Sequence, residues 1–204
     1  AEVREAFDLE MAGAASRRNG RNSYVVAFEG DPGEEARLAE AAADGLRMFE
    51  QLFGYRSRTF IAPCYTWPAS LEKTLRAEGV EALQGMIHQC LPGGGHRRHW
   101  FGSRNALGQT YLLRNCCFEP TTDACADPVD ACMERIACAF RWHKPAVISS
   151  HRVNYVGFIH PTNRDRSLRL LGELLDRIRR RWPDVRFRTS DELTSLLADQ
   201  KNPT

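Results

Sequence analysis

Short apolar runs alternate along the chain with longer segments in which apolar residues recur every three or four positions. The short runs predict β-strands, and the longer segments predict amphipathic α-helices. The predicted strands lie at residues 24–28, 58–62, 80–86, 109–115, 146–150 and 185–188. Because strands and helices mostly alternate, the pattern indicates an α/β protein with a mainly parallel sheet. We predict an incomplete (β/α) barrel that forms a single domain over residues 1–204, with an open doubly wound sheet as the alternative.

Capping residues predict where the helices begin. Ser, Thr, Asp and Asn are favoured at the N-cap position and Pro at the first helical position. The predicted helix starts are Asp31, Pro68, Asp127, Thr162 or Asn163, and the capping box Thr189–Glu192. The first of these helices is predicted to end at Gly54, a residue that accepts the left-handed conformation of a C-cap. Residues 88–108, with glycines at their centre, are predicted to form a long loop.

Polar residues follow directly after the apolar run at residues 146–148. In parallel sheets that are covered by helices, ligands bind beyond the carboxyl ends of the strands. His151 lies at such an end, where an imidazole can act as a general acid or base near neutral pH. Arg152, Asn154 and Tyr155 could bind hydroxyl groups or an oxyanion there. The alternatives are a structural histidine bonded to a neighbouring loop, and polar residues that cap the next helix.

Two further strand ends carry candidate binding residues. Tyr65 and Trp67 follow the second predicted strand, and aromatic side chains of this kind stack on the apolar faces of sugar rings. The alternative is a loop that packs its aromatic residues on the protein. Other polar residues could face the same mouth of the sheet: Asn105 in the long loop, and Arg114, Asn115 and Glu119 at the end of the fourth strand.

Charge and hydropathy exclude several classes of partner. The chain has 28 basic and 26 acidic residues and a net charge of +2, so no broad attraction to nucleic acid or to an anionic membrane is expected. No apolar run approaches the roughly 20 residues of a membrane span, and no signal peptide opens the chain. The cytoplasm is the favoured compartment.

The first residues of the chain have the composition of the middle of a helix and not of its N-terminus. This predicts a chain whose beginning is missing.

The chain contains seven cysteines, an odd number in an apolar setting, which favours free and mostly buried thiols over a disulfide framework. Cys90, His96 and His99 offer three metal-binding side chains, but their spacing matches no standard zinc site. No metal ligand is therefore predicted in residues 1–204.

Three segments, Phe60–Trp67, Arg114–Pro120 and Ile148–Tyr155, resemble the polysaccharide deacetylase superfamily, and the similarity spans residues 24–195. The resemblance implies a deformed (β/α) barrel that hydrolyses N- or O-acetyl groups on glycans with a divalent metal, usually zinc. It assigns His151 the role of the acid and places residues 63–67 on the wall of the substrate groove. The substrate or ligand is then a carbohydrate.

The chain departs from the family pattern at the metal site. The paired aspartates of the first strand and the His-x3-His motif do not occur in residues 1–204, and Ile61 stands where the family usually has arginine. Zinc or another divalent metal is therefore expected in a longer protein, of which this chain would be the C-terminal portion. The alternative function is a metal-free barrel that binds a glycan or another ligand without catalysis.

Overall fold

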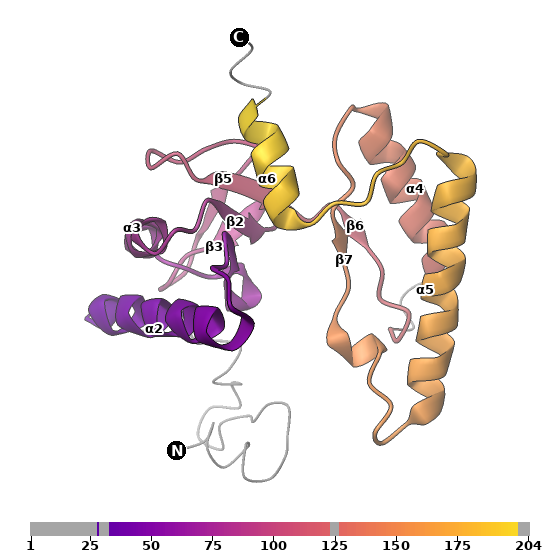
Figure 1. Ribbon diagram of the computed structural model, residues 1–204, viewed down its shortest axis with the longest axis horizontal. Coiled ribbons are helices and arrows are strands. Elements are labelled where there is room, and N and C mark those ends of the chain that lie inside the picture. Colours follow the sequence, from indigo (N-terminus) through magenta and orange to yellow (C-terminus); the bar gives the residue numbers. More distant parts are fainter. Residues whose placement is uncertain (1–27, 29–32, 123–126, 200–204) are drawn as a thin grey trace. The chain divides into compact units, whose positions relative to one another are not determined.

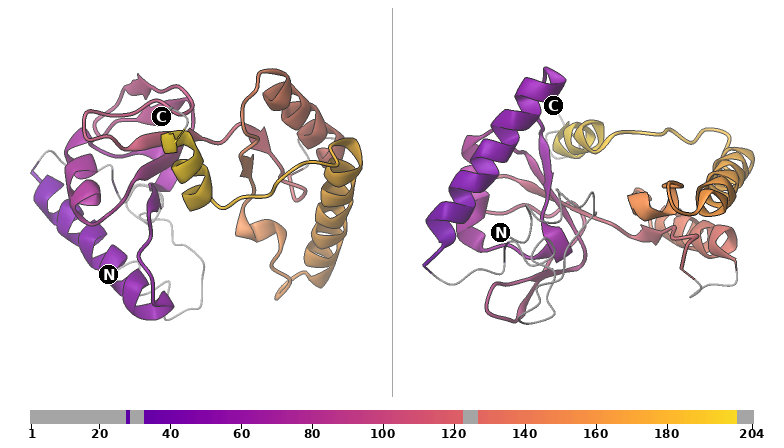
Figure 2. Two further views of the ribbon diagram at one scale, coloured as in Figure 1. Left: turned by 45° about the horizontal axis from the view of Figure 1, so that its top comes forward. Right: turned by 90° about the horizontal axis from the view of Figure 1, so that it is seen from below.

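The computed structural model describes residues 28, 33–122 and 127–199. The chain divides into two compact units, unit 1 (Ala1–Leu113 and Thr189–Thr204) and unit 2 (Arg114–Arg188), which are coloured along the sequence in Figures 1 and 2. Each unit has its own hydrophobic core. The prediction of a mixed α/β protein with parallel strands is confirmed. The single-domain organisation stays a prediction, and the predicted strand at residues 24–28 lies outside the described residues apart from Phe28.

Unit 1 is built on a parallel sheet in the order β1-β2-β5. Its strands are β1 (Thr59–Ile61), β2 (Ala82–Gly85) and β5 (Thr110–Leu113). All four residues of β5 are buried, as expected of a strand in a parallel sheet that is covered on both faces. The three strands fall within the predicted segments. The described strands do not close into a barrel.

Helices α2 (Glu35–Phe53) and α3 (Ala69–Ala77) pack with this sheet through Ala42, Leu71 and Leu75. Gly54 has a φ of 75° and its N–H donates to the carbonyl of Glu50 at 2.8 Å, so the predicted C-cap is confirmed. The helix begins later than predicted, with Glu34 as its N-cap. The predicted cap, Asp31, lies outside the described residues.

The segment predicted as a long loop contains a β-hairpin. Its strands β3 (His88–Cys90) and β4 (His96–Arg98) are antiparallel, and the three glycines at 93–95 form the turn with positive φ angles. Every residue of β4 is exposed. A strand with no buried face has no alternation of apolar and polar residues, which is why the sequence pattern did not indicate it.

Unit 2 contains a short parallel pair, β6 (Cys116–Cys117) and β7 (Ile148–Ser149), beside helices α4 (Pro128–Arg141) and α5 (Pro161–Arg181). The fully buried residues of its core include Phe118, Val129, Ile136 and Leu174. The predicted start of α4 is confirmed, because the carboxylate of Asp127 accepts from the N–H groups of Val129 and Asp130 at 2.9 Å each.

Two predictions at the end of the chain have opposite outcomes. The capping box of α6 (Ser190–Asp199) is confirmed, since Thr189 N–H donates to Glu192 Oε2 at 2.9 Å and Glu192 N–H donates to Thr189 Oγ1 at 3.2 Å. The prediction of a strand at residues 185–188 is wrong. Its alternating residues have no strand beside them in the described part of unit 2, and Val185 instead packs on the core of that unit.

Helix α5 begins at Pro161 with His160 as N-cap, and not after Thr162 or Asn163. The Asn163 side chain turns back and donates to the carbonyl of Val153 at 2.9 Å, so it is committed to the preceding loop. The basic run at the end of α5 makes an ion pair with α4, from Arg177 to Asp130 at 2.5 Å. In the part of the chain that is described, no helix is long and apolar enough to cross a membrane.

Candidate functional site

A glutamate and a histidine meet in unit 2 where its two parallel strands end. Glu119 follows β6 by two residues and His151 follows β7 by two residues, and Phe118 N–H pairs with the Ser149 carbonyl at 2.9 Å between them. His151 Nδ1 lies 2.7 Å from Glu119 Oε1. The His151 side chain is 63% exposed and that of Glu119 is 15% exposed. Among the described residues none bonds the second ring nitrogen, Nε2, which is therefore open to a ligand.

The buried side chain of Asn154 holds the glutamate in place. Its Nδ2 group donates to Glu119 Oε2 at 2.7 Å and to the His151 carbonyl at 2.8 Å. Its Oδ1 accepts from the N–H of Thr121 at 3.1 Å and from the Thr121 hydroxyl. Asn154 is 0% exposed, and its bond to Glu119 Oε2 positions that carboxylate. Its role as a substrate ligand stays a prediction.

The remaining polar residues after β7 form the wall of this site. The Tyr155 hydroxyl lies 2.7 Å from Ser150 Oγ, and its ring is half-buried. Arg152 is exposed at the start of η2 (Arg152–Asn154), a single 3-10 turn. The structure thus brings together three predicted site residues, His151, Asn154 and Tyr155, with Arg152 beside them in sequence. Glu119 was indicated by its position after a strand, but neither Thr121 nor Ser150 was predicted.

Asn115 has a structural role that the sequence did not indicate. Its Nδ2 group donates to the Pro145 carbonyl at 2.9 Å, and its Oδ1 accepts from Val147 N–H at 2.7 Å. These bonds continue the pairing of β6 and β7 beyond their ends. Both polar atoms of the Asn115 side chain thus serve the fold, and its role as a substrate ligand stays a prediction. Arg114 lies one residue earlier and is partly buried.

Trp67 and Asn105 lie in unit 1, where both join a buried network. The Trp67 ring is only 3% exposed and its indole N–H donates to Glu72 Oε1 at 3.1 Å. Asn105 Nδ2 donates to Glu72 Oε2 and to Gln109 Oε1, both at 2.8 Å. These bonds commit the Trp67 indole and the Asn105 amide to the fold, while the substrate-binding role of both residues stays a prediction. Tyr65 is half-buried and packs on the core of unit 1.

The network around Glu72 is the most extensive buried polar cluster of unit 1. The Tyr111 hydroxyl donates to Glu72 Oε1 at 2.9 Å, and the His99 ring stacks on Tyr111 with centroids 3.6 Å apart. His99 Nε2 lies 2.8 Å from Gln89 Oε1. Burial lowers the pKa of His99 and, together with Glu72, raises the pKa of Tyr111. His99 is thus held as a neutral ring, which suits a structural role.

The lowered pKa of His99 predicts that unit 1 loses stability in acid. The unfolded chain takes up a proton on this ring below about pH 6.5, whereas the folded chain does so only at lower pH. The free energy of unfolding should therefore fall as the pH drops below about 6.5, by at most about 1.4 kcal/mol per pH unit. Urea unfolding of wild type, His99→Phe and the exposed control His88→Gln measures this. A slope that survives in His99→Phe contradicts the assignment.

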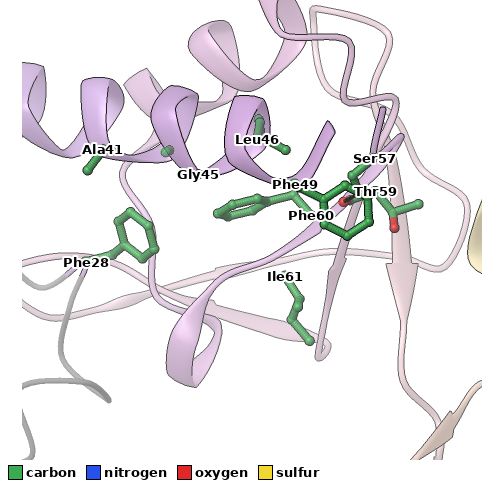
Figure 3. Close-up of a pocket in the computed structure, with 10 residues that line it drawn as sticks. Phe28, Ala41, Gly45, Leu46, Phe49, Ser57, Thr59, Phe60 and Ile61 are labelled. Atoms are coloured by element: carbon green, nitrogen blue, oxygen red, sulfur yellow. Dashed lines mark hydrogen bonds between the residues drawn. The ribbon is translucent and has the colours of Figure 1, made fainter. Parts of the chain in front are cut away.

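An apolar groove of about 400 Å³ lies between α2 and β1 (Figure 3). Phe28, Leu46, Phe49 and Phe60 line it, and the Phe28 and Phe60 rings meet edge to face at 6.1 Å. Its polar residues are Ser57 and Thr59, and the Ser57 hydroxyl already donates to the Thr59 carbonyl at 2.8 Å. None of the described residues that line this groove is titratable, and their side chains offer an apolar packing surface.

Metal-binding side chains are scattered in the described residues, where no group of three His, Cys, Asp or Glu is placed to hold an ion. None of the six described cysteines is in a disulfide, while Cys125 lies outside the described residues. Burial raises the pKa of Cys116 to about 12 and that of Cys132 to about 11, so both are protonated and poorly reactive. Contrary to the prediction of mostly buried thiols, Cys64, Cys117 and Cys138 are exposed.

We compared the chain with models of known protein families, with curated proteins and with solved structures, and none of the three comparisons found a match. The similarity to polysaccharide deacetylases stays a prediction from three short motifs. The function has to be argued from the geometry of the site itself.

Proposed function

We propose that this chain is part of a hydrolase of the carbohydrate deacetylase type, which removes acetyl groups from a glycan and uses His151 as its general acid. The observation that carries the proposal is the pair formed by His151 Nδ1 and Glu119 Oε1 at 2.7 Å, at the carboxyl ends of two parallel strands. Ligand sites of α/β proteins form at such strand ends. The exposed imidazole leaves Nε2 for the reacting group.

The chemistry needs a proton at the leaving group. Water adds to the acetyl carbonyl carbon, and the bond from that carbon to the sugar nitrogen or oxygen then breaks. The leaving atom takes a proton as the bond breaks, and the imidazolium form of His151 supplies it from Nε2, while the proton that the attacking water releases restores the imidazolium. Glu119 accepts the Nδ1–H bond before and after the transfer, which keeps the ring in one orientation and one tautomer. Arg152 and the Tyr155 hydroxyl are the side chains that we assign to the acetyl oxygen and sugar hydroxyls.

The family resemblance also implies a divalent metal, but the described residues do not fit one, because no three candidate ligands lie together. The steps above are therefore derived for His151 and Glu119 alone. The proposal includes zinc or a similar ion only for a longer protein that supplies the ligands.

The proposal extends to the fold, as a deformed and incomplete (β/α) barrel of which this chain forms the C-terminal portion. The parallel order β1-β2-β5 leaves one edge of β1 without a described neighbour. The apolar groove between α2 and β1 lies beside that edge. An open edge next to an apolar groove is the surface on which a further strand and helix of a barrel would pack.

The test is acetate release from N-acetylated chitooligosaccharides by the protein purified at its natural length. We expect His151→Ala to lower kcat/KM about 100-fold or more, which is the usual contribution of a general acid. His160→Ala is the matched control, because His160 is also exposed in unit 2 and its side chain makes no capping bond. Unchanged activity in His151→Ala contradicts the proposal. Chitooligosaccharide binding without acetate release favours the non-catalytic glycan-binding alternative.

A further inference from the structure

The last two residues of η2 and the loop that leads from it to α5 present a concentrated set of apolar side chains to solvent. This loop, residues 153–160, lies at the lower end of unit 2 in Figure 1. Its exposed apolar side chains are Val153 (54%), Val156 (54%), Phe158 (97%) and Ile159 (79%). Single exposed apolar residues are common on protein surfaces, but four within seven residues form a patch that needs a partner.

The conformation that exposes these side chains is fixed by the rest of unit 2. Asn163 in the first turn of α5 donates to the carbonyls of Val153 at 2.9 Å and Val156 at 3.4 Å. A Cβ atom at Gly157 would lie 3.0 Å from the Cβ atom of Arg164, so the backbone of the loop packs directly on the helix. The exposed tip is therefore held in place by specific contacts.

Basic residues lie near the apolar residues in the sequence, and one of them, Arg166, donates to the Pro120 carbonyl. In residues 151–172 the chain has four arginines and a single acidic residue, Asp165, whereas the whole chain is nearly balanced at +2. The exposed basic residues beside the loop are Arg152, His160, Arg164, Arg166 and Arg169. Arg164 is paired with Asp165 at 2.8 Å, which leaves the neighbourhood positively charged. Basic residues thus outnumber acidic ones in the segment that carries the exposed apolar side chains.

We propose that loop 153–160 binds the surface of a lipid bilayer that contains anionic lipids, with Phe158 and Ile159 inserted among the acyl chains. Apolar side chains flanked by basic ones bind at the boundary between headgroups and hydrocarbon. The arginines are attracted to anionic headgroups over a distance of about one Debye length. This attachment is peripheral, requires no membrane-spanning helix, and does not rest on the proposed hydrolase activity.

Two other partners fit the loop less well. A stable dimer buries roughly 800 Å² on each partner, more than four side chains on one loop supply. A sugar ring binds to flat aromatic faces, whereas three of the four exposed residues, Val153, Val156 and Ile159, are aliphatic. Aliphatic side chains together with one phenyl ring match the chemistry of acyl chains.

The test is co-sedimentation of the purified chain with vesicles of phosphatidylcholine, with and without phosphatidylglycerol. We expect binding that requires phosphatidylglycerol and weakens as salt is added. The double variant Phe158→Ser with Ile159→Ser should bind at least tenfold more weakly, since both side chains are exposed and their loss should leave the fold intact. Trp142→Ser is the matched control, because Trp142 is 71% exposed elsewhere in unit 2. In a separate variant, Phe158→Trp, tryptophan emission should shift to shorter wavelength when vesicles are added.

Three outcomes would overturn the proposal. The first is wild-type protein that stays in solution with both kinds of vesicle. The second is equal vesicle binding by wild type and the double variant, which places the membrane contact elsewhere. The third is a double variant that changes only self-association in sedimentation velocity, or only chitooligosaccharide affinity, which assigns the loop to a second copy or to a glycan.

Discussion

Replacing Asn154 by leucine should lower the free energy of unfolding of the protein by about 4 kcal/mol, because at least four polar groups lose their bonds to a fully buried side chain, the Thr121 hydroxyl among them. Leucine has a similar size but no amide. Glu119 Oε2 would lose its 2.7 Å bond, and the Thr121 N–H and the His151 carbonyl would lose theirs. Urea unfolding followed by circular dichroism measures the loss.

Asn154→Asp separates the loss of a hydrogen bond from the effect of charge. It keeps the shape of the side chain but places a second carboxylate against Glu119. Repulsion from Glu119 and burial both favour the protonated form of the introduced carboxyl group. Its pKa is therefore higher in the folded state than in the unfolded state. The variant is then most stable at low pH and loses stability as the pH rises through the pKa of this group in the folded state. The difference in the free energy of unfolding between wild type and Asn154→Asp should therefore become smaller in acid. A deficit independent of pH, or a loss below about 1 kcal/mol in Asn154→Leu, contradicts the assigned role.

The second large effect is expected at Glu72 in unit 1. Glu72→Ala should lower the free energy of unfolding by roughly 4 kcal/mol, because it leaves three donors without an acceptor. The donors are the Trp67 indole N–H, the Tyr111 hydroxyl and the Asn105 amide. The Glu72 side chain is almost fully buried, so water cannot replace it without opening the core. Chemical unfolding measures the change.

Glu78→Ala is the matched control for Glu72. Glu78 lies at the end of the same helix and forms an ion pair with Arg47 at 3.2 Å, and the Arg47 side chain is 51% exposed. Ion pairs of this kind contribute about 0–1 kcal/mol. We therefore expect Glu78→Ala to be nearly neutral. Equal effects of the two substitutions would show that the buried network contributes little to the stability of unit 1.

The sequence predicted those parts of the fold that have a periodic pattern or a local cap. The strands β1, β2 and β5 and the helices α2 to α5 combine apolar runs or stripes with turn and cap residues, and Asp127 caps α4 through neighbouring N–H groups. These signals act over a few residues, so they can be read from the chain alone. The exposed hairpin β3–β4 has no such signal. Residues 185–188 have the alternating pattern of a strand, but no strand lies beside them among the described residues, so they do not form one.

The candidate site could be predicted only in part. His151 was indicated because polar residues after a buried strand mark the ligand-binding edge of a parallel sheet. The roles of Asn154 and Trp67 could not be read in the same way, because they depend on contacts with residues far away in the sequence. Asn154 meets Glu119 across 35 positions, and the Trp67 carbonyl accepts from Gln89 Nε2 across 22 positions. The residue type alone does not distinguish a polar side chain that binds substrate from one that donates a hydrogen bond to a buried carboxylate.

The central claim is that Glu119 orients His151 so that Nε2 faces a reacting group. The most direct measurement is the tautomer of the His151 ring by nitrogen-15 NMR, at a pH where the ring is neutral. The account predicts the proton on Nδ1, donated to Glu119, and predicts loss of this preference in Glu119→Ala. A proton on Nε2 in the wild-type protein, or a tautomer unaffected by Glu119→Ala, would contradict the claim.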